Sequence, residues 1–228
     1  MKIAMWSGPR NLSTAMMYSF GNRGDLRPWD EPFYAAYLDK TNLEHPMQAE
    51  ILAQGPTDPQ AVADQIAERG DGQFLKLMTF HMLDGFPMDW GQDCQHFHLI
   101  RHPARVIASY SQKRESPTLK DIGFAAHLDI YRRFPGPVVS SYDIRLDPRG
   151  MLEKLCNALG VDFDPAMLSW PKGPKPFDGV WAPHWYDAVH RSTGFATAEG
   201  PLPDLRGRDA DLCAAALPAY EEMAKNKI

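Results

Sequence analysis

The sequence is poor in cysteine, the residue that forms disulfides and most structural zinc sites. It contains only three cysteines among 228 residues, and they are widely separated, at Cys94, Cys156 and Cys213. Their number excludes a disulfide-rich scaffold, and their spacing lacks the close pairs of a zinc site. We therefore expect three reduced thiols packed in the core.

A long apolar run and a dominant sign of charge are also lacking. Ser7, Gly8, Pro9 and Arg10 interrupt the first apolar stretch, so we expect neither a signal peptide nor a spanning segment, and the expected compartment is the cytoplasm. Lys and Arg number 24 and Asp and Glu number 29, which gives a formal net charge of −5. We therefore expect no general attraction to nucleic acid or to a membrane, and any anion site must be local.

Hydrophobic residues make up 44% of the chain and charged residues 23%, as in ordinary folded proteins. We expect one full-sized domain over residues 1–228. Apolar runs of strand length alternate with amphipathic stretches of helix length, which predicts an α/β fold with a parallel sheet covered on both faces by helices. The expected strands are 2–6, 26–29, 73–77, 96–101 and 137–140. The expected helices are 13–22, 59–69, 103–113, 119–133 and 148–159.

The last quarter of the chain changes character. Residues 170–204 combine a high density of Pro and Gly with many aromatic residues. Low-complexity linkers rarely carry so many aromatics, so we expect an irregular but ordered cover over the sheet or over a site. Residues 209–224 have an apolar helical face and predict a closing helix that docks on the rest of the chain.

The stretch "MWSGPRNLSTAMMYSF" near the N-terminus has the form of a phosphate-binding loop without its lysine. A strand leads into a turn at Gly8 and Pro9, and an apolar helix follows, so backbone N–H groups converge on the helix start. Compared with the pattern G-x-x-x-x-G-K-[ST], Ser13 replaces the second glycine, Thr14 the lysine and Ala15 the hydroxyl that binds magnesium. The stretch therefore indicates an anion site that does not depend on Mg²⁺.

A second stretch, "HFHLIRHPARVIASY", has the same strand-then-turn form. Arg101 follows a buried strand, Pro103 starts the next helix and Ser109 lies further along that helix. Ligands of open parallel sheets bind at the carboxyl ends of the strands, so we expect Arg101 at the same edge as the first loop. A capped strand-to-helix turn at the first stretch and a salt bridge at the second are the alternatives.

The two stretches resemble those of sulfotransferases that use 3′-phosphoadenylyl sulfate (PAPS). "PRNLSTA" is similar to the family's 5′-phosphosulfate loop, P-K-S-G-T-T-W, with Arg10 at the lysine position. "RHPARVIASY" is similar to the 3′-phosphate motif R-[ND]-P-x-D-V-x-x-S-Y, although Arg105 stands at the acidic position. A third stretch, "SSYDIRLDPRGMLEKLCNALGVDFDPAMLSW", resembles a segment whose tyrosine lies near the adenine, and Tyr142 holds that place.

The resemblance implies a three-layer, P-loop-like parallel sheet and a sulfotransferase that uses PAPS and releases 3′,5′-adenosine diphosphate. PAPS is anionic at two places, and the chain offers two anion sites. No metal is expected, because the transferred group bears less charge than a phosphoryl group and Arg10 can neutralise the bridging oxygen as its bond breaks. "HRSTGF" loosely resembles the family's loop over the 3′-phosphate. The residues expected to bind the donor are Gly8, Pro9, Arg10, Asn11, Leu12, Ser13, Thr14, Arg101, Ser109, Tyr142 and Arg191.

The acceptor hydroxyl or amine must lose a proton as it attacks, so a general base is expected. Glu31 follows the second expected strand, and some sulfotransferases that the chain resembles take a carboxylate base from a comparable early position. His81 follows the third strand and resembles the family's K-[TS]-H base, although it lies five residues after Lys76 rather than two. We favour Glu31 and keep His81 as the alternative.

Two other functions remain open from the sequence alone. A P-loop small-molecule kinase would share the first loop, but it would need a lysine and a hydroxyl where Thr14 and Ala15 stand. A non-catalytic nucleotide-binding protein on the same scaffold would share both anion sites. Several aromatic residues are candidates for either an acceptor pocket or the core. They are Trp29, Phe33, Tyr34, Tyr37, Trp181, Trp185 and Tyr186.

Overall fold

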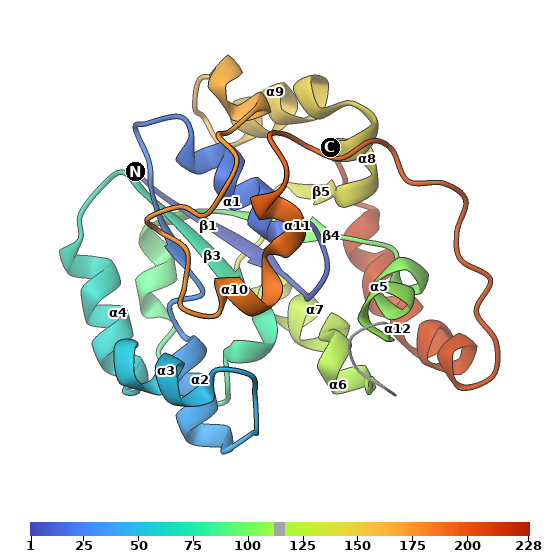
Figure 1. The fold of residues 1–228 in the computed structure, drawn as a ribbon, viewed down its shortest axis with the longest axis horizontal. Coiled ribbons are helices and arrows are strands. Elements are labelled where there is room, and N and C mark those ends of the chain that lie inside the picture. Colours follow the sequence, from blue (N-terminus) through green and yellow to red (C-terminus); the bar gives the residue numbers. More distant parts are fainter. Residues whose placement is uncertain (112–116) are drawn as a thin grey trace.

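The computed structural model describes residues 1–111 and 117–228 (Figure 1). The described residues form one parallel sheet of five strands in the order β2-β3-β1-β4-β5, with helices on both faces. This architecture confirms the expected α/β fold. The strands are β1 (Lys2–Ser7), β2 (Arg27–Asp30), β3 (Gln73–Met78), β4 (Cys94–Ile100) and β5 (Val138–Ser140).

Helices of varied length connect the strands and cover the sheet. The α-helices are α1 (Ser13–Gly21), α2 (Tyr34–Thr41), α3 (Gln48–Gln54), α4 (Pro59–Glu68), α5 (Pro103–Ser111), α6 (Leu119–Ile122), α7 (Phe124–Arg133), α8 (Ser141–Leu146), α9 (Pro148–Ala158), α10 (Ala182–Trp185), α11 (Asp187–His190) and α12 (Arg208–Ala224). The short 3₁₀ helices are η1 (Thr79–His81), η2 (Asp89–Asp93) and η3 (Pro165–Leu168).

Both faces of the sheet are buried, as is typical of parallel sheets whose strands are apolar throughout. On one face, Ile3 and Met5 of β1 pack in a core with residues of α1 and α9. On the other face, Ala4 and Trp6 pack in a core with residues of α4 and α7. Side chains therefore alternate between two helical layers along the central strand, and a third core lies between α5, α7 and α12.

The observed elements follow the expected ones closely, except that one expected helix is divided in two. The expected helix 119–133 is two helices, because Gly123 adopts a φ of 69° between α6 and α7. Thr118 and Asp121 form a capping box at the start of α6, which stabilises this short piece as a separate helix. The end of the expected helix 103–113 lies outside the described residues. The sequence patterns do not predict α2, α3, α8, α10 or α11.

The segment of residues 170–204 covers one face of the sheet with two short helices, α10 and α11, and irregular chain (Figure 1). Its aromatic residues explain its order, because Trp170, Trp181 and Tyr186 are buried in the core that contains α1. After α11, a long connection leads to α12, which packs against α5 and α7.

The carboxyl ends of the parallel strands lie at one edge of the sheet, and the predicted site residues follow them. Gly8 follows β1, Glu31 follows β2, His81 ends η1 after β3, and Arg101 follows β4. The fold therefore brings four separate segments of the chain to one edge.

The structure also shows the state of the cysteines and bears on membrane-spanning helices and metal sites. Cys94 and Cys156 are buried, Cys213 is partly buried, and all three are free. Within the described part of the chain, no helix combines the length and apolar character needed to cross a bilayer. The same residues contain no cluster of three or more His, Cys, Asp or Glu side chains placed to hold a metal ion.

Candidate functional site

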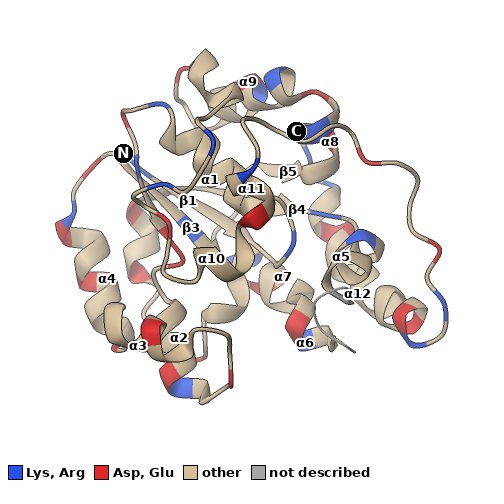
Figure 2. Cartoon of the chain, in the orientation of Figure 1, with Lys and Arg blue, Asp and Glu red and all other residues tan. Residues whose placement is uncertain are grey.

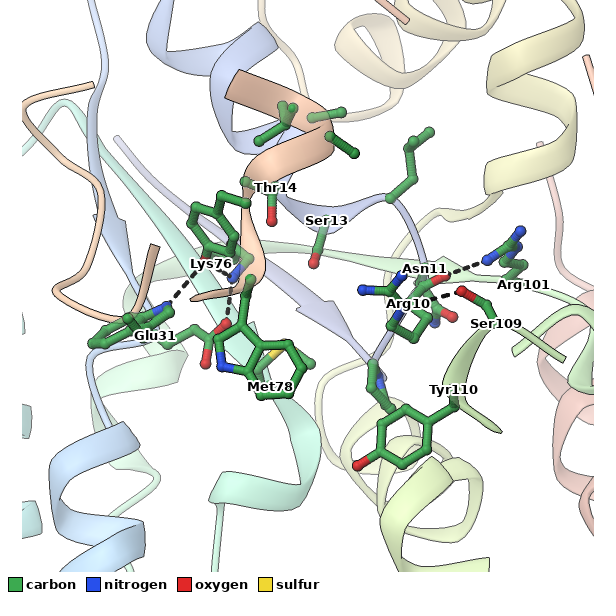
Figure 3. Close-up of a pocket in the computed structure, with 18 of the residues that line it drawn as sticks. Arg10, Asn11, Ser13, Thr14, Glu31, Lys76, Met78, Arg101, Ser109 and Tyr110 are labelled. Carbon is green, nitrogen blue, oxygen red and sulfur yellow. Dashed lines mark hydrogen bonds and ion pairs between the residues drawn. The ribbon is translucent and has the colours of Figure 1, made fainter. Parts of the chain in front are cut away.

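A cavity of about 520 Å³ lies at the carboxyl edge of the sheet (Figure 3). Its wall combines the loop after β1, the ends of β2, β3 and β4, and parts of the cover. The predicted site residues in that wall are Pro9, Arg10, Asn11, Leu12, Ser13, Thr14, Glu31, His81, Arg101 and Ser109. The structure therefore brings both predicted anion sites and both candidate bases to one cavity. Gly8, Tyr142 and Arg191 lie outside its wall.

The loop between β1 and α1 has a backbone that non-glycine residues rarely adopt. Arg10 and Leu12 have φ angles of 61° and 78°, and Asn11 lies between them. Each left-handed residue costs about 1–3 kcal/mol, and such strain is typical of ligand-binding loops. The Nδ2 atom of buried Asn11 donates a hydrogen bond of 3.0 Å to the carbonyl oxygen of Leu99 in β4, which fixes the loop against the sheet.

The start of α1 has no side-chain cap. Leu12 occupies the N-cap position and makes no side-chain hydrogen bond there, so the alternative of a turn capped by Asn11 or Ser13 is wrong. The first N–H groups of a helix have no partner within the helix and carry partial positive charge. The side chains of Ser13 and Thr14 lie beside these groups in the cavity wall (Figure 3). This helix start is suited to an anion.

Arginine side chains gather on one side of the loop. Arg101 donates from Nη1 to the carbonyl oxygen of Arg10 at 2.7 Å, and Arg10 donates from Nε to Ser109 Oγ at 3.0 Å. Burial lowers the pKa of Arg10, and the neighbouring positive charge of Arg101 lowers it further. The guanidinium of Arg10 therefore lies with Arg101 and Ser109 (Figure 3), and this crowding of cations favours the binding of an anion.

Two further charged residues that sequence reasoning missed adjoin Arg101: Arg145, which lines the cavity, and Glu199, which does not. Glu199, in the connection between α11 and α12, makes an ion pair with Arg101. Arg145 of α8 lies 3.0 Å from the same carboxylate oxygen. The position of Arg145 just after β5 is a signal that the sequence carried, because the carboxyl ends of parallel strands meet. Nothing in the local pattern around Glu199 predicts its position.

The opposite side of the cavity contains a buried cluster of charges (Figure 3). Lys76 of β3 is only 1% exposed, and its Nζ lies 2.8 Å from Asp30 Oδ1 and 2.8 Å from the hydroxyl of Tyr186. Glu31 pairs with the same ammonium group. Sequence reasoning missed this cluster, although a lysine inside an apolar strand is unusual and signals a buried partner.

The surroundings shift the pKa values of this cluster in informative directions. Burial raises the pKa of Glu31, while the charge of Lys76 opposes the shift. Burial acts to lower the pKa of Lys76, but Asp30 and Glu31 more than offset it, so the pKa is raised and the ammonium stays charged. Burial lowers the pKa of His81 well below its usual value, and Lys76 and His45 act in the same direction.

The two candidate bases lie close together. His81 Nδ1 is 3.9 Å from Glu31 Oε2, and the imidazole stacks between Tyr34 and Tyr37 at ring-centroid distances of 4.6 and 4.7 Å. Glu31 has a φ of 43°, a strained conformation for a residue with a side chain. A carboxyl group with a raised pKa is a stronger base than an ordinary one, whereas a histidine with a strongly lowered pKa is a weaker base.

Most of the candidate aromatic residues line the cavity on the Glu31 side. Those in its wall are Tyr34, Tyr37, Trp181, Trp185 and Tyr186. The other two pack elsewhere. The guanidinium of Arg69 lies 3.6 Å from the ring centroid of Trp29, and Phe33 stacks on Trp90 at 5.6 Å. The pattern of aromatic residues alone does not separate these two groups.

Besides Gly8, two predicted donor-binding residues, Tyr142 and Arg191, lie outside the cavity wall. Tyr142 of α8 is 37% exposed, and the guanidinium of Arg105 lies 5.4 Å from its ring centroid, so it adjoins the arginine side. The side chain of Arg191 is 69% exposed and pairs with Asp187 at 3.7 Å.

Comparisons with known proteins give a family match over nearly the whole chain and relatives whose names refer to a different activity. Residues 1–227 match a protein family described as a sulfotransferase domain. Two Arabidopsis thaliana proteins, "Branched-chain-amino-acid aminotransferase-like protein 2" and "Branched-chain-amino-acid aminotransferase-like protein 1", are each 34% identical over 227 residues, which is 96% of this chain and 40% of each relative. The chain thus spans about two fifths of the length of these curated relatives.

Solved structures resemble the fold. The "Sulfotransferase Domain from the Synechococcus PCC 7002 Olefin Synthase" has a TM-score of 0.57 and 22% identity, over 94% of this chain and 93% of its own. The "Sulfotransferase Domain from the Curacin Biosynthetic Pathway" has a TM-score of 0.57 and 17% identity, over 95% and 97%. At these identities the likeness concerns the fold alone.

Proposed function

The chain belongs to the sulfotransferase domain family, and on that premise we propose that it transfers a sulfuryl group from PAPS to a small-molecule acceptor. The acceptor offers a hydroxyl or amine group. We further propose that the reaction needs no metal, because arginine and backbone N–H groups can neutralise the charge that develops on the leaving phosphate.

One observation carries the proposal: a single cavity joins the uncapped start of α1 to Arg101 and Ser109 on one side and to Glu31 on the other. Ser13 and Thr14 lie between these two sides (Figure 3). A donor with a phosphosulfate at one end and a 3′-phosphate at the other fits this order. Its sulfuryl group would then face Glu31, where an acceptor can attack it.

The residues of this chain have distinct tasks in the proposed reaction. PAPS supplies the sulfuryl group, whose sulfur forms a bond to the acceptor oxygen or nitrogen as the bond to the phosphate oxygen breaks. Glu31 accepts the proton that the acceptor loses. The N–H groups at the start of α1 and the side chains of Arg10 and Thr14 stabilise the negative charge that moves onto the phosphate. Lys76 holds the carboxylate of Glu31 in place.

The acceptor side of the cavity favours a particular class of molecule. Tyr34, Tyr37, Trp181 and Trp185 line it, and aromatic walls bind flat or apolar bodies through area burial and ring contacts. We propose that the acceptor has an aromatic or otherwise apolar body with its nucleophilic group directed at Glu31.

Binding of 3′,5′-adenosine diphosphate, measured by calorimetry, tests the donor site. We expect saturable binding to the natural chain and about 10- to 100-fold weaker binding to Arg101→Ala, because a charge-assisted contact to the 3′-phosphate is lost. Arg149→Ala is the matched control, since Arg149 is an exposed residue paired with Glu153 on α9. Arg10→Ala is expected to reduce turnover with PAPS by about 10²–10³-fold.

Each alternative function has its own outcome in these measurements. Binding of Mg-ATP without binding of 3′,5′-adenosine diphosphate would replace the proposal by a P-loop kinase. Binding of 3′,5′-adenosine diphosphate with no turnover across a panel of hydroxyl and amine acceptors would indicate a nucleotide-binding protein without activity. An unchanged dissociation constant for Arg101→Ala would remove Arg101 from the donor site.

A further inference from the structure

We propose that Arg101, Arg105 and Arg145 form one phosphomonoester site, and that Glu199 is its internal occupant, which the 3′-phosphate of the donor displaces on binding. The identity of the nucleotide rests on the proposed function. The site itself rests on the contacts of these four side chains. They come from four places in the chain: the end of β4, α5, α8 and the connection after α11.

The three guanidinium groups surround one carboxylate. Arg101 Nη2 pairs with Glu199 Oε1, and Arg145 Nη1 lies 3.0 Å from the same oxygen. Arg105 Nε lies 3.5 Å from Glu199 Oε2. Three planar cations directed at one point form the arrangement that proteins use to bind phosphate groups.

The carboxylate fits this site only in part. The side chain of Glu199 is 6% exposed, and its Oε2 atom makes no hydrogen bond despite being buried. A phosphomonoester has three terminal oxygens, so it can accept a hydrogen bond from each of the three arginines, whereas a carboxylate has two oxygens in one plane. The site therefore has more donor capacity than its present occupant uses.

The balance of charge points the same way. Three positive charges face a single negative one, and two of them stay uncompensated within this group of four side chains. Burial lowers the pKa of Arg145, and although Glu199 raises it, the charges of Arg101 and Arg105 lower it again. A phosphate dianion offers more negative charge than Glu199, and two anions placed among the same three arginines repel each other. They cannot share the site, so the carboxylate leaves.

The arginines also hold the backbone of the segment that carries Glu199. Arg105 donates from Nη2 to the carbonyl oxygen of Gly200 at 2.5 Å, and Arg145 donates from Nε to that of Thr197 at 2.8 Å. Figure 2 shows basic residues on α5 and α8 and an acidic residue on the connection that passes them. Because the connection has no regular secondary structure there, few backbone hydrogen bonds oppose its movement. When Arg105 and Arg145 bind a phosphate instead, they give up these backbone hydrogen bonds, so the segment and the Glu199 carboxylate are released together.

Arg105, the residue that departs from the family motif, has a role in this arrangement. Arg105 stands where the 3′-phosphate motif of the family has an acidic residue. An arginine at this position adds a third cation, and Glu199 supplies a carboxylate from a different part of the chain. Tyr142, which the resemblance places near the adenine, lies against the same Arg105.

The variant Glu199→Gln tests the proposal, because it keeps the shape of the side chain and removes its charge. An occupant that fills the site about 90% of the time weakens the apparent affinity about tenfold. We therefore expect 3′,5′-adenosine diphosphate to bind Glu199→Gln at least about tenfold more tightly than the natural chain. Adenosine 5′-monophosphate, which lacks the 3′-phosphate, should bind both with equal affinity. The matched control is Asp204→Asn, an exposed acid of the same connection that pairs with Arg206 and should change neither affinity.

The outcomes separate the inference from the proposed function. Unchanged or weaker binding of 3′,5′-adenosine diphosphate to Glu199→Gln, or an equal gain for adenosine 5′-monophosphate, overturns the inference and leaves the donor assignment intact. If neither chain binds the nucleotide, the proposed function fails. Inorganic phosphate then tests the site alone, by its effect on the melting temperature. A larger stabilisation of Glu199→Gln than of the natural chain supports the three-arginine site, and an equal effect refutes it.

Discussion

Replacement of Lys76 by methionine is expected to destabilise the protein in a way that depends on pH. The ammonium group is 1% exposed and has three polar partners: Asp30, Glu31 and the hydroxyl of Tyr186. Methionine fills a similar volume but leaves two carboxylates in a buried site without a cation. Removal of one partner from a buried ion pair costs about 3–5 kcal/mol, so we expect the free energy of unfolding to fall by that amount near pH 8.

The sign of the pH effect follows from Glu31. Burial already raises its pKa against the opposing charge of Lys76, and loss of Lys76 raises the pKa further. A carboxyl group whose pKa is higher in the folded state binds more protons there, so its contribution to stability is present at low pH and is lost as pH rises through the folded pKa. The deficit of Lys76→Met should therefore be smaller at pH 5 than at pH 8.

Urea unfolding at several pH values measures this deficit, with Lys154→Met as the matched control. Lys154 is exposed on α9, and its replacement should change the free energy of unfolding by less than about 0.5 kcal/mol at every pH. Adding Glu31→Gln to Lys76→Met should recover part of the loss at pH 8, because one buried charge is removed. A deficit that is independent of pH, or a double variant less stable than Lys76→Met, would refute this account of the cluster.

Three further predictions concern the proposed base and the loop. Glu31→Gln should lower kcat about 10²–10⁴-fold while Lys76 keeps its contact with Asp30, whereas His81→Asn should have a small effect; the opposite order would make His81 the base. In the natural chain, kcat/KM should rise with pH, with an apparent pKa above the ordinary range of glutamate. An apparent pKa at or below that range would contradict a Glu31 base. Asn11→Ala should lower the free energy of unfolding by about 1–3 kcal/mol in urea, because the buried carbonyl of Leu99 loses its donor. It should also weaken 3′,5′-adenosine diphosphate binding, and unchanged affinity would mean that the loop keeps its shape without this bond.

Local chemistry explains why so much of the fold was predictable. Asp58 with Pro59 and Asp147 with Pro148 start α4 and α9 through a side-chain cap and a proline in the first turn. Gly123 carried an equally local signal for the break between α6 and α7, because left-handed backbone favours glycine. Such signals depend on neighbours in the sequence and can be read without the tertiary structure.

The parts of the candidate site that were missed depend on contacts between distant segments. Arg101 and Ser109 could be placed near the first loop because strand ends of a parallel sheet meet. Tyr186 reaches Lys76 and Asp30 only because the cover folds across the sheet. Glu199 reaches Arg101 through a connection without regular structure, whose path no periodic pattern encodes. Charge pairing between such segments is decided by tertiary structure alone.

The phenol of Tyr186 makes the two ends of the cover unequal. It donates to Asp30 at 2.7 Å, while the backbone N–H of Gly179 donates to the same carboxyl group at 3.1 Å. This end of the cover is therefore anchored on Asp30, whereas the end that carries Glu199 is held by ion pairs with the three arginines of the proposed phosphate site. Under the proposed function, the part of the cover beside the nucleotide would move each time the donor binds and leaves. The part beside the acceptor would stay fixed, because its hydrogen bonds to Asp30 belong to the folded core.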